Sequence, residues 1–455
     1  MARLLLFLFF IIANCSFANV TLPSVFSDHM VLQQNGEVKF WGWANPNETI
    51  KIQPSWSEGV YETTASNLAQ WELKIKTPTY GGPYSITIEG NNLITINDVL
   101  IGEVWLCSGQ SNMEMSASWG IKNMDEVEKA TQPHIRFFNV PKLTATSPQL
   151  NVPAIWEVCT PEIMKNSSAV AYFFAKRLQE VSKGIPVGLL VSAWGGTPAE
   201  IWVPENTIQN NAVLESAAKK LSPSKWGPTK PGQAYNAMIH PLSGFSMSGA
   251  LWHQGESNVG SLVYDQTLTA LITSWRRLWQ DEFPFYIVQI APYDDGFKHF
   301  GGVDIRNAQR KVCHILENTG LVVISDISTV DDIHPKDKKS VGIRLANLAL
   351  KQHYKSIEGV VESPEIGTID FEGKNAILHF TDSEGLYLKT EVSLFEIAGA
   401  DRVFYPARAK LKDEQIHISS KKVKTPKYVR FAWGNALQSN VFNCANLPAS
   451  SFTTE

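Results

Sequence analysis

The stretch Val104-Trp-Leu-Cys-Ser-Gly-Gln-Ser-Asn-Met113 joins a short apolar run to a turn rich in Gly, Ser and Asn. An apolar run of this length, ended by a turn signal, is typical of a buried strand. Similar runs occur at Pro186–Val191, Gly249–Trp252, Phe285–Ile290 and Leu321–Ile324. Buried strands that alternate with helices predict a parallel sheet covered on both faces, so we expect an α/β core.

The helices of this core are expected between and after the strand runs. Ala169–Leu178 and Leu268–Leu278 have apolar residues at helical spacing, and Lys338–Gln352 places Val341 and Leu345 on one side. Spacing of three and four residues is the mark of an amphipathic helix. These segments supply the cover that a parallel sheet requires.

Both ends of the chain have a different pattern, in which polar and apolar residues alternate. Val38–Trp43 is an example near the N-terminus, and Ala376–Phe380 is an example near the C-terminus. Alternation over short segments between turn signals predicts half-buried strands and small β domains. We therefore divide the chain into a signal peptide (1–18), an N-terminal β-sandwich-like domain (19–98), a catalytic domain (99–355) and a C-terminal β domain (356–455).

Length and composition agree with several cores and argue against some partners. The chain has 455 residues, 44% of them hydrophobic, which exceeds what a single core usually holds. The formal net charge of −4 gives no basic excess, so no nucleic-acid partner is expected. The oligomeric state is left open.

The first residues predict export. Met1-Ala-Arg3 gives a short positive start, Leu4–Ile12 is apolar but too short to span a bilayer, and Ser16-Phe-Ala18 offers a cleavage site. A lipid anchor on Cys15 is the weaker alternative. We expect a periplasmic or extracellular protein that has no membrane segment once the signal is removed.

Four cysteines remain after signal removal, and they lie far apart in the sequence. Their positions lack the close pairs of a metal site. An exported protein can form disulfides, but the spacing does not pair these cysteines, and four buried thiols are at least as strong an expectation.

Four polar clusters follow the predicted strands. They are Gly109–Met113, Trp194–Thr197, His253–Asn258 and Asp331–Pro335. One Gly-rich turn after a strand is usually only a turn. Four of them are harder to dismiss, because functional groups of an open parallel sheet gather beyond the carboxyl ends of its strands.

These clusters contain the parts of an acyl-transfer site. A serine hydroxyl needs a nearby base to become a nucleophile, and histidine suits this role near neutral pH. Ser111 and His334 are our candidates. The reaction also needs donors for the developing oxyanion. We expect them to be the N–H of Ser111, a backbone N–H of Gly195 or Gly196, and the side-chain amide of Gln254.

The chain resembles the sialate O-acetylesterase-like branch of the SGNH/GDSL hydrolases. Gly109–Met113, Trp194–Thr197, Trp252–Asn258 and Asp332–Pro335 are similar to its four sequence blocks, and Leu22–Gln33 is similar to its opening. The resemblance extends over nearly the whole mature chain. It implies a three-layer α/β/α SGNH-hydrolase core with flanking N-terminal and C-terminal β domains, and it implies the same nucleophile, base and oxyanion donors.

The group that orients His334 is left open by both lines of reasoning. The general SGNH pattern points to Asp331, three positions before the histidine, whereas this branch more often uses the position of Asp332. Some relatives manage with a backbone carbonyl. We favour Asp331 slightly, because a residue one turn away can fold its carboxylate back onto Nδ1.

Further residues are candidates for substrate binding, although each has a structural alternative. Trp119 and Trp202 are possible sugar platforms or packing residues, and His253 and His240 are rival bases that more simply have structural roles. The substrate-binding candidates are Gln110, Asn112, Asn236 and Glu256.

The function that we expect is hydrolysis of acetyl esters on sugars through a serine acyl-enzyme, without a metal or an organic cofactor. The partner is an acetylated sugar or glycan. The substrate is either an acetylated sialic acid or a hemicellulose such as xylan or xyloglucan. Alternatives of other classes are a glycosidase, which needs two carboxylates about 5–9.5 Å apart, and a non-catalytic carbohydrate-binding protein.

Overall fold

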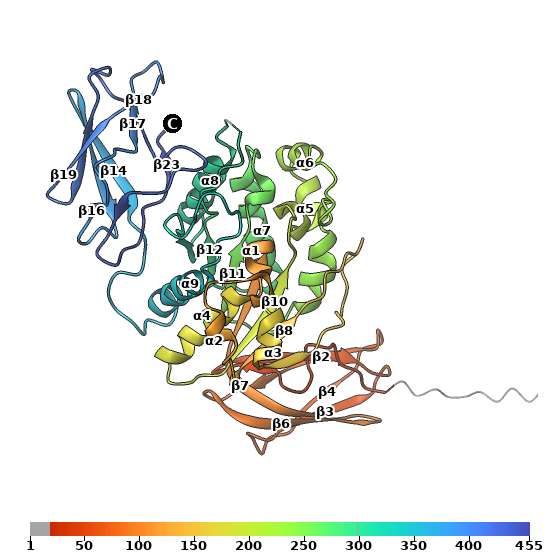
Figure 1. Cartoon of the computed structure of the whole chain (residues 1–455). Helices are drawn as coiled ribbons and strands as arrows, with labels where there is room; N and C mark the ends of the chain where they lie inside the picture. The colour runs from red at the N-terminus through yellow and green to blue at the C-terminus, as the bar shows by residue number, and fades with distance from the viewer. Residues whose placement is uncertain (1–18, 298) are drawn as a thin grey trace, which may run out of the picture.

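The computed structural model describes residues 19–297 and 299–455, and the predicted signal peptide lies outside them. Figure 1 shows a central α/β region with a β region at each end of the chain. The N-terminal strands lie below the core in this view and the C-terminal strands lie beside α8 and α9. The expected α/β core with flanking β domains is confirmed.

The core is built on a sheet in the order β13-β12-β11-β7-β10-β8-β9. All neighbours in this path are parallel except β8 and β9. The carboxyl ends of six strands therefore meet at one edge. The strands are β7 (Leu93–Gly109), β8 (Gln132–Asn139), β9 (Trp156–Cys159), β10 (Val187–Ala193), β11 (Gly249–His253), β12 (Phe285–Val288) and β13 (Thr319–Val322).

Helices cover both faces of this sheet, which gives the three layers. Alternate residues of β7 belong to different cores: Trp105 packs in the cluster that contains α4 and α9, and Leu106 packs in the cluster that contains α7. No helix in residues 19–297 and 299–455 has the length and apolar character needed to cross a membrane. The helices are α1 (Ser111–Glu114), α2 (Met124–Val127), α3 (Pro161–Asn166), α4 (Ala169–Val181), α5 (Glu205–Gln209), α6 (Ala212–Ala218), α7 (Tyr264–Trp279), α8 (Gly301–Ile315) and α9 (Lys338–Gln352).

The N-terminal β region is joined to the core by one long strand. The first part of β7 pairs with β1 and β6, and its last part pairs with β10 and β11. This strand crosses position 98/99, where the sequence predicts a domain boundary. The other strands here are β1 (Val31–Gln33), β2 (Glu37–Trp43), β3 (Thr49–Pro54), β4 (Tyr61–Thr64), β5 (Gln70–Lys76) and β6 (Gly81–Glu89).

The C-terminal region contains two four-stranded antiparallel sheets, ordered β14-β15-β20-β19 and β18-β17-β21-β23. A separate hydrophobic cluster fills this region, which includes buried Ile416 and Phe431. The strands are β14 (Glu365–Glu372), β15 (Asn375–Thr381), β16 (Tyr387–Leu388), β17 (Phe395–Ala398), β18 (Tyr405–Pro406), β19 (Arg408–Lys412), β20 (Gln415–Ser419), β21 (Tyr428–Phe431), β22 (Val441–Phe442) and β23 (Phe452–Thr453).

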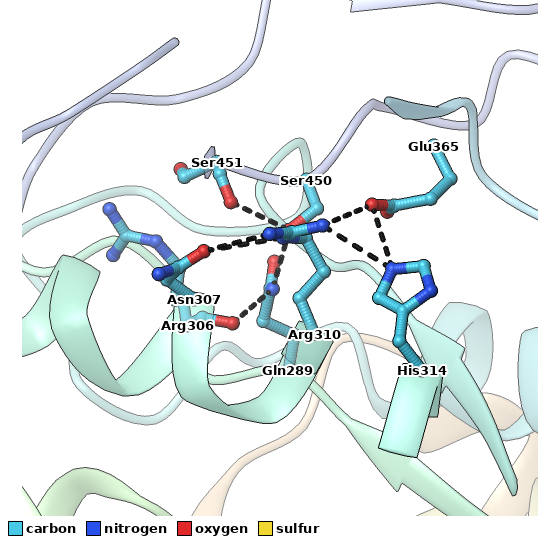
Figure 2. A network of polar contacts seen from close by, with 8 residues as sticks. All are labelled: Gln289, Arg306, Asn307, Arg310, His314, Glu365, Ser450 and Ser451. Carbon is cyan, nitrogen blue, oxygen red and sulfur yellow. Dashed lines mark hydrogen bonds and ion pairs between the residues drawn. The ribbon is translucent and has the colours of Figure 1, made fainter. Parts of the chain in front are cut away.

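A polar network on α8 links the core to the C-terminal region, and Figure 2 shows its members. Arg310 pairs with Glu365 at 2.7 Å, and the amide of Gln289 donates to the hydroxyl of Ser450 at 2.8 Å. Fully buried Arg306 donates to the carbonyl oxygens of Gly434 at 2.6 Å and Asn435 at 3.1 Å. These contacts connect polar groups on both sides of the junction.

The four cysteines after the signal segment are free thiols. Cys107 and Cys159 are buried, Cys313 is half-buried and Cys444 is exposed. The expectation of four buried thiols is therefore correct for Cys107 and Cys159 and wrong for exposed Cys444. Burial raises the pKa of the Cys313 thiol to about 12, so this side chain is neutral near pH 7.

Candidate active site

The polar clusters meet at the carboxyl edge of the sheet. Gly109–Met113 follows β7, Trp194–Thr197 follows β10 and His253–Asn258 ends β11, while Asp331–Pro335 lies in the loop between β13 and α9. Because these strands run parallel, their ends bring distant parts of the chain together. The juxtaposition that the sequence pattern predicts is present.

Ser111 is held at the first position of α1, directly after a sharp turn. Gly109 has φ of +140°, and a Cβ at this position would lie 2.2 Å from the carbonyl oxygen of His253. A side chain is therefore excluded at Gly109, since the end of β7 lies tightly against β11. The N–H of Gln110 donates to that same carbonyl at 3.0 Å, and this contact fixes the turn before the serine.

Ser111 and His334 form a hydrogen-bonded pair. Nε2 of His334 lies 2.8 Å from Oγ of Ser111, although 223 positions separate the two residues. Burial lowers the pKa of His334, the ammonium of Lys338 lowers it further, and the carboxylate of Asp332 opposes this change. A neutral imidazole near pH 7 is the form that accepts a proton from the serine hydroxyl.

The two aspartates have different partners from those expected. Asp332 accepts a hydrogen bond from the backbone N–H of His334 at 2.8 Å and pairs with Lys336 at 3.6 Å. Asp331 is exposed, and its contact with the Thr329 side chain helps to lower its pKa. Across the described residues, Nδ1 of His334 has no hydrogen-bond partner. Asp332 therefore fixes the turn that carries the histidine, and neither aspartate contacts the imidazole nitrogen.

The structure distinguishes between the two glycine donors. The N–H of Gly195 donates to Oε2 of Glu114 at 2.7 Å, and Oε1 of Glu114 pairs with Lys142 at 2.5 Å. In the described part of the chain, the N–H groups of Ser111 and Gly196 have no acceptor. Gly195 still lies beside the nucleophile, since a Cβ on it would be 3.2 Å from Cβ of Ser111. Ser111 and Gly196 are thus the open backbone donors.

Gln254 is not available as the third oxyanion donor in this arrangement. Its side chain is fully buried, and Nε2 donates to the carbonyl of Thr197 at 3.2 Å and to Oδ1 of Asn258 at 2.7 Å. Its Oε1 accepts from the hydroxyl of Tyr264 at 2.8 Å. Both amide hydrogens are engaged, so the Gln254 side chain links the Trp194–Thr197 loop to the His253–Asn258 loop.

Asn112 and Glu256 form a buried polar network next to the Ser111–His334 pair. Nδ2 of Asn112 donates to Oε1 of Glu256 at 2.6 Å and to the carbonyl of Ile333 at 3.0 Å. The ammonium of Lys338 donates to Oδ1 of Asn112 at 2.6 Å. Burial raises the pKa of Glu256 and lowers the pKa of Lys338 to about 7. The network thus ties the serine turn to the histidine loop.

The other two predicted substrate-binding residues also have structural partners. Oε1 of Gln110 accepts hydrogen bonds from the N–H groups of Gly255 and Ser257 at 3.4 and 3.2 Å, and its side chain is buried. Asn236 donates to the carbonyl of Ala145 at 3.1 Å, and no contact joins it to the Ser111–His334 pair in the described residues. Both side chains therefore make structural contacts with neighbouring loops.

The two alternative bases and one of the two suggested sugar platforms also occupy structural positions. His253 is fully buried, neither of its ring nitrogens has a partner among the residues that the structure describes, and burial lowers its pKa well below the usual value. His240 contacts the carbonyl of Gln149. Trp202 is fully buried, whereas Trp119 is exposed and packs edge-on against the ring of His334 at 5.8 Å. Of the two suggested sugar platforms, only Trp119 has an accessible ring.

Three residues that contact this group of side chains were not predicted as site residues. Glu114 lies one helical turn after Ser111, a spacing that places both on one face of α1 and was available as a signal. Lys338 stands at the start of α9 with a buried side chain. Trp226 lies against Gly196, and no local pattern marked it.

Comparisons with known proteins agree with this geometry. Residues 101–351 match the family described as carbohydrate esterase, sialic acid-specific acetylesterase. The human sialate O-acetylesterase is 30% identical over 416 residues, covering 82% of this chain and 79% of that one. The mouse sialate O-acetylesterase is 27% identical over 442 residues, covering 82% and 81%.

A solved structure is similar over its whole length. It is a novel carbohydrate acetylesterase from Xanthomonas citri, with a TM-score of 0.86 and 33% identity, covering 96% of this chain and 99% of that chain. The relationship spans the core and both β regions. The chain belongs to the carbohydrate esterase, sialic acid-specific acetylesterase family.

Proposed function

We propose that this protein is a carbohydrate O-acetylesterase in which Ser111 is the nucleophile and His334 is the general base. The 2.8 Å contact between Oγ of Ser111 and Nε2 of His334 carries the proposal. Two backbone N–H groups without an acceptor in the described residues, those of Ser111 and Gly196, lie in the Gly109–Met113 turn and the Trp194–Thr197 loop. A paired hydroxyl and imidazole beside free backbone donors is the arrangement that acyl transfer requires.

The reaction follows from these positions. Oγ of Ser111 attacks the acetyl carbonyl while His334 accepts its proton, and the N–H groups of Ser111 and Gly196 stabilise the oxyanion. His334 then returns the proton to the sugar oxygen as the C–O bond breaks, which leaves an acetylated serine. Water, deprotonated by the same imidazole, attacks the acyl group and releases acetate.

An acetylated sialic acid is the first candidate substrate, with the 9-O-acetyl ester as the expected site of cleavage. The curated relatives that carry the name sialate O-acetylesterase support this choice. We also propose that the protein is exported to the periplasm or the extracellular space, where such glycans are met. The apolar run that follows a positive start supports export.

A neutral acetylated glycan such as xylan or xyloglucan is the second candidate. A sialic acid carries a carboxylate that needs a cation, yet three lysines around the site already have partners. Lys142 pairs with Glu114, Lys336 pairs with Asp332, and Lys338 donates to an amide oxygen. None of these three ammonium groups is free to bind a carboxylate, which supports a sugar without a negative charge at the positions they occupy.

A glycosidase would need a second carboxylate close to Glu256, and Glu103 on β7 is one candidate. Glu103 precedes the end of β7 by six residues, which corresponds to about 20 Å along a strand. It lies in a separate buried network with Ser248 and Tyr354. Glu256 sits at the opposite end of the sheet, so the two carboxylates are too far apart for the ~5–9.5 Å that glycoside hydrolysis needs.

The test is an acetate-release screen on acetylated sialic acids, acetylated xylan and acetylated xyloglucan oligosaccharides, with wild type and Ser111→Ala side by side. Removal of the nucleophile should lower kcat by about 10⁴-fold or more. Ser118→Ala, an exposed serine near the site, is the matched control and should retain activity. Full activity of Ser111→Ala would refute the catalytic assignment.

A covalent probe separates the esterase from a non-catalytic binding protein. A serine-directed phosphonate should label wild type and fail to label Ser111→Ala. Sugar binding without labelling and without acetate release would refute the proposal in favour of the binding protein.

A further inference from the structure

The tryptophans of this protein differ widely in exposure. The sequence has 14 of them, and Trp105, Trp156, Trp202, Trp252 and Trp275 are among its largest fully buried side chains. Of the tryptophans within residues 19–297 and 299–455, only Trp119 and Trp226 are exposed, with 42% and 67% of their surface accessible. A large aromatic ring held in water marks a binding surface when it lies at a functional site.

Trp119 touches the base. Its ring packs edge-on against the imidazole of His334, with the centroids 5.8 Å apart and an angle of 83° between the planes. It belongs to a short 3-10 turn, Ala117–Trp119, that follows α1. The ring therefore stands on the histidine side of the nucleophile.

Trp226 touches the loop with the open oxyanion donor. Gly196 has φ of +72°, and a Cβ on it would lie 2.5 Å from Cβ of Trp226 and 3.0 Å from its Cγ. The carbonyl of Trp226 accepts a hydrogen bond from Nε1 of Trp194 at 3.0 Å. The segment around Trp226 is thus fastened to the 194–197 loop, and its ring stands on the glycine side.

A continuous series of contacts connects the two indoles through Ser111. Trp119 packs on His334, His334 bonds to Ser111, Ser111 lies against Gly195, and the next residue, Gly196, lies under Trp226. We propose that Trp119 and Trp226 are the two walls of a glycan-binding subsite that spans Ser111. This inference rests on the proposed function, and it assigns the substrate to a chain of at least two sugar rings rather than a single free sugar.

The chemistry of the two rings favours sugars. One face of a pyranose carries C–H groups that pack on an aromatic face, while its hydroxyls remain in water, so an exposed indole binds it without a buried polar partner. Lys225 lies 4.7 Å from the centre of the Trp226 ring and covers part of it. Because the walls flank the nucleophile on two sides, an acetylated residue with a sugar neighbour contacts both of them.

The experiment compares esters that share an acetyl group and differ in chain length. Acetate release is measured for acetylated mono-, di- and tetrasaccharides and for p-nitrophenyl acetate, which has no sugar. For wild type, we expect kcat/KM to rise at least tenfold from the monosaccharide to the longer chain. Equal values for all lengths would overturn the inference.

Two variants test whether the indoles of Trp119 and Trp226 cause the higher kcat/KM on longer chains. Trp226→Ala should lower kcat/KM for the tetrasaccharide by about tenfold relative to p-nitrophenyl acetate, mainly through KM, while Trp226→Phe should recover most of it. Trp119→Ala should show the same selective loss. Phe371→Ala, an exposed aromatic residue on β14 of the C-terminal region, is the control and should behave as wild type. Equal losses on both esters would indicate a merely structural role and overturn the inference.

The outcomes separate this inference from the proposed function. If acetylated sugars of every length are cleaved equally and the tryptophan variants match wild type, the esterase assignment stands and the subsite is refuted. If no acetylated sugar is cleaved by an enzyme that hydrolyses p-nitrophenyl acetate, both are refuted. Lys225→Gln, assayed on acidic and neutral chains, shows whether the ammonium beside Trp226 binds a carboxylate of the substrate.

Discussion

Oε2 of Glu114 accepts a hydrogen bond from the N–H of Gly195 at 2.7 Å, which joins the helix that carries Ser111 to the loop that carries Gly196. The second oxygen of this carboxylate pairs with Lys142 at 2.5 Å. A charged acceptor makes a stronger hydrogen bond than a neutral one. Glu114 therefore holds the loop so that the next N–H, that of Gly196, stays open.

Glu114→Ala tests this relationship. Without the carboxylate, the 194–197 loop loses its fixed position and the donor becomes less well aimed, so kcat for a small acetyl ester should fall about tenfold. Glu114→Gln keeps an acceptor oxygen and should lose less. Glu128→Ala, an exposed glutamate on the surface, is the control. A faster Glu114→Ala enzyme would mean instead that the carboxylate competes with the oxyanion for the Gly195 N–H.

The second prediction concerns the two aspartates before the histidine. Asp332 fixes the turn through the backbone N–H of His334, whereas Asp331 is exposed. Asp332→Ala should therefore lower kcat about tenfold, and Asp331→Ala should change it by less than about twofold. Steady-state rates on one acetyl ester are the measurement. The reverse ranking would restore Asp331 as the orienting group.

Much of the fold could be predicted because burial leaves a strong pattern in a parallel sheet. Lys338–Gln352 was expected as a helix and forms α9 with the same bounds, and the run at Gly249 forms β11. The strand at Gln132–Asn139 was missed, since polar residues at its start conceal the run. The continuity of β7 was also missed, because a strand that leaves one core for another gives no local signal.

The site shows where local pattern fails. Ser111 and His334 were selected because each stands in a distinctive turn, and in the structure their side chains are hydrogen-bonded to each other. Gln254 was expected as an oxyanion donor and Asn236 as a substrate-binding residue, yet their amides donate to backbone carbonyls of nearby loops. An amide in a polar turn has the same sequence signature whether it faces a ligand or a carbonyl, so only three-dimensional contacts distinguish the two roles.

The third prediction concerns the pH dependence that Lys338 imposes. Its buried ammonium lowers the pKa of His334, because a nearby positive charge disfavours the imidazolium. The neutral imidazole is active, so activity is lost as pH falls through this pKa. In Lys338→Met the opposing charge is gone, the pKa of His334 rises, and the acidic limb of kcat/KM should move to higher pH.

Lys339→Met is the matched control for that profile, because Lys339 pairs with Glu126 at the surface. Its acidic limb should coincide with that of wild type. Asp332→Asn should move the limb in the opposite direction from Lys338→Met, since the Asp332 carboxylate raises the pKa of His334. Three coincident profiles would show that neither charge acts on the base.

The last prediction concerns the attachment of the C-terminal region to α8. Arg306 is fully buried and donates to the carbonyls of Gly434 and Asn435, which lie in a loop of that region (Figure 2 shows Arg306 among its neighbours on the helix). Arg306→Met leaves both carbonyls without this donor, so the free energy of unfolding should fall by about 2–4 kcal/mol. Urea denaturation measures the change, and Arg408→Met, at an exposed position on β19, should stay within about 0.5 kcal/mol of wild type. Since Arg306 has no contact with Ser111 or His334 in the described residues, kcat of the folded variant should be retained. An unchanged urea midpoint would show that the C-terminal region is held to the core by Arg310, Gln289 and apolar packing instead.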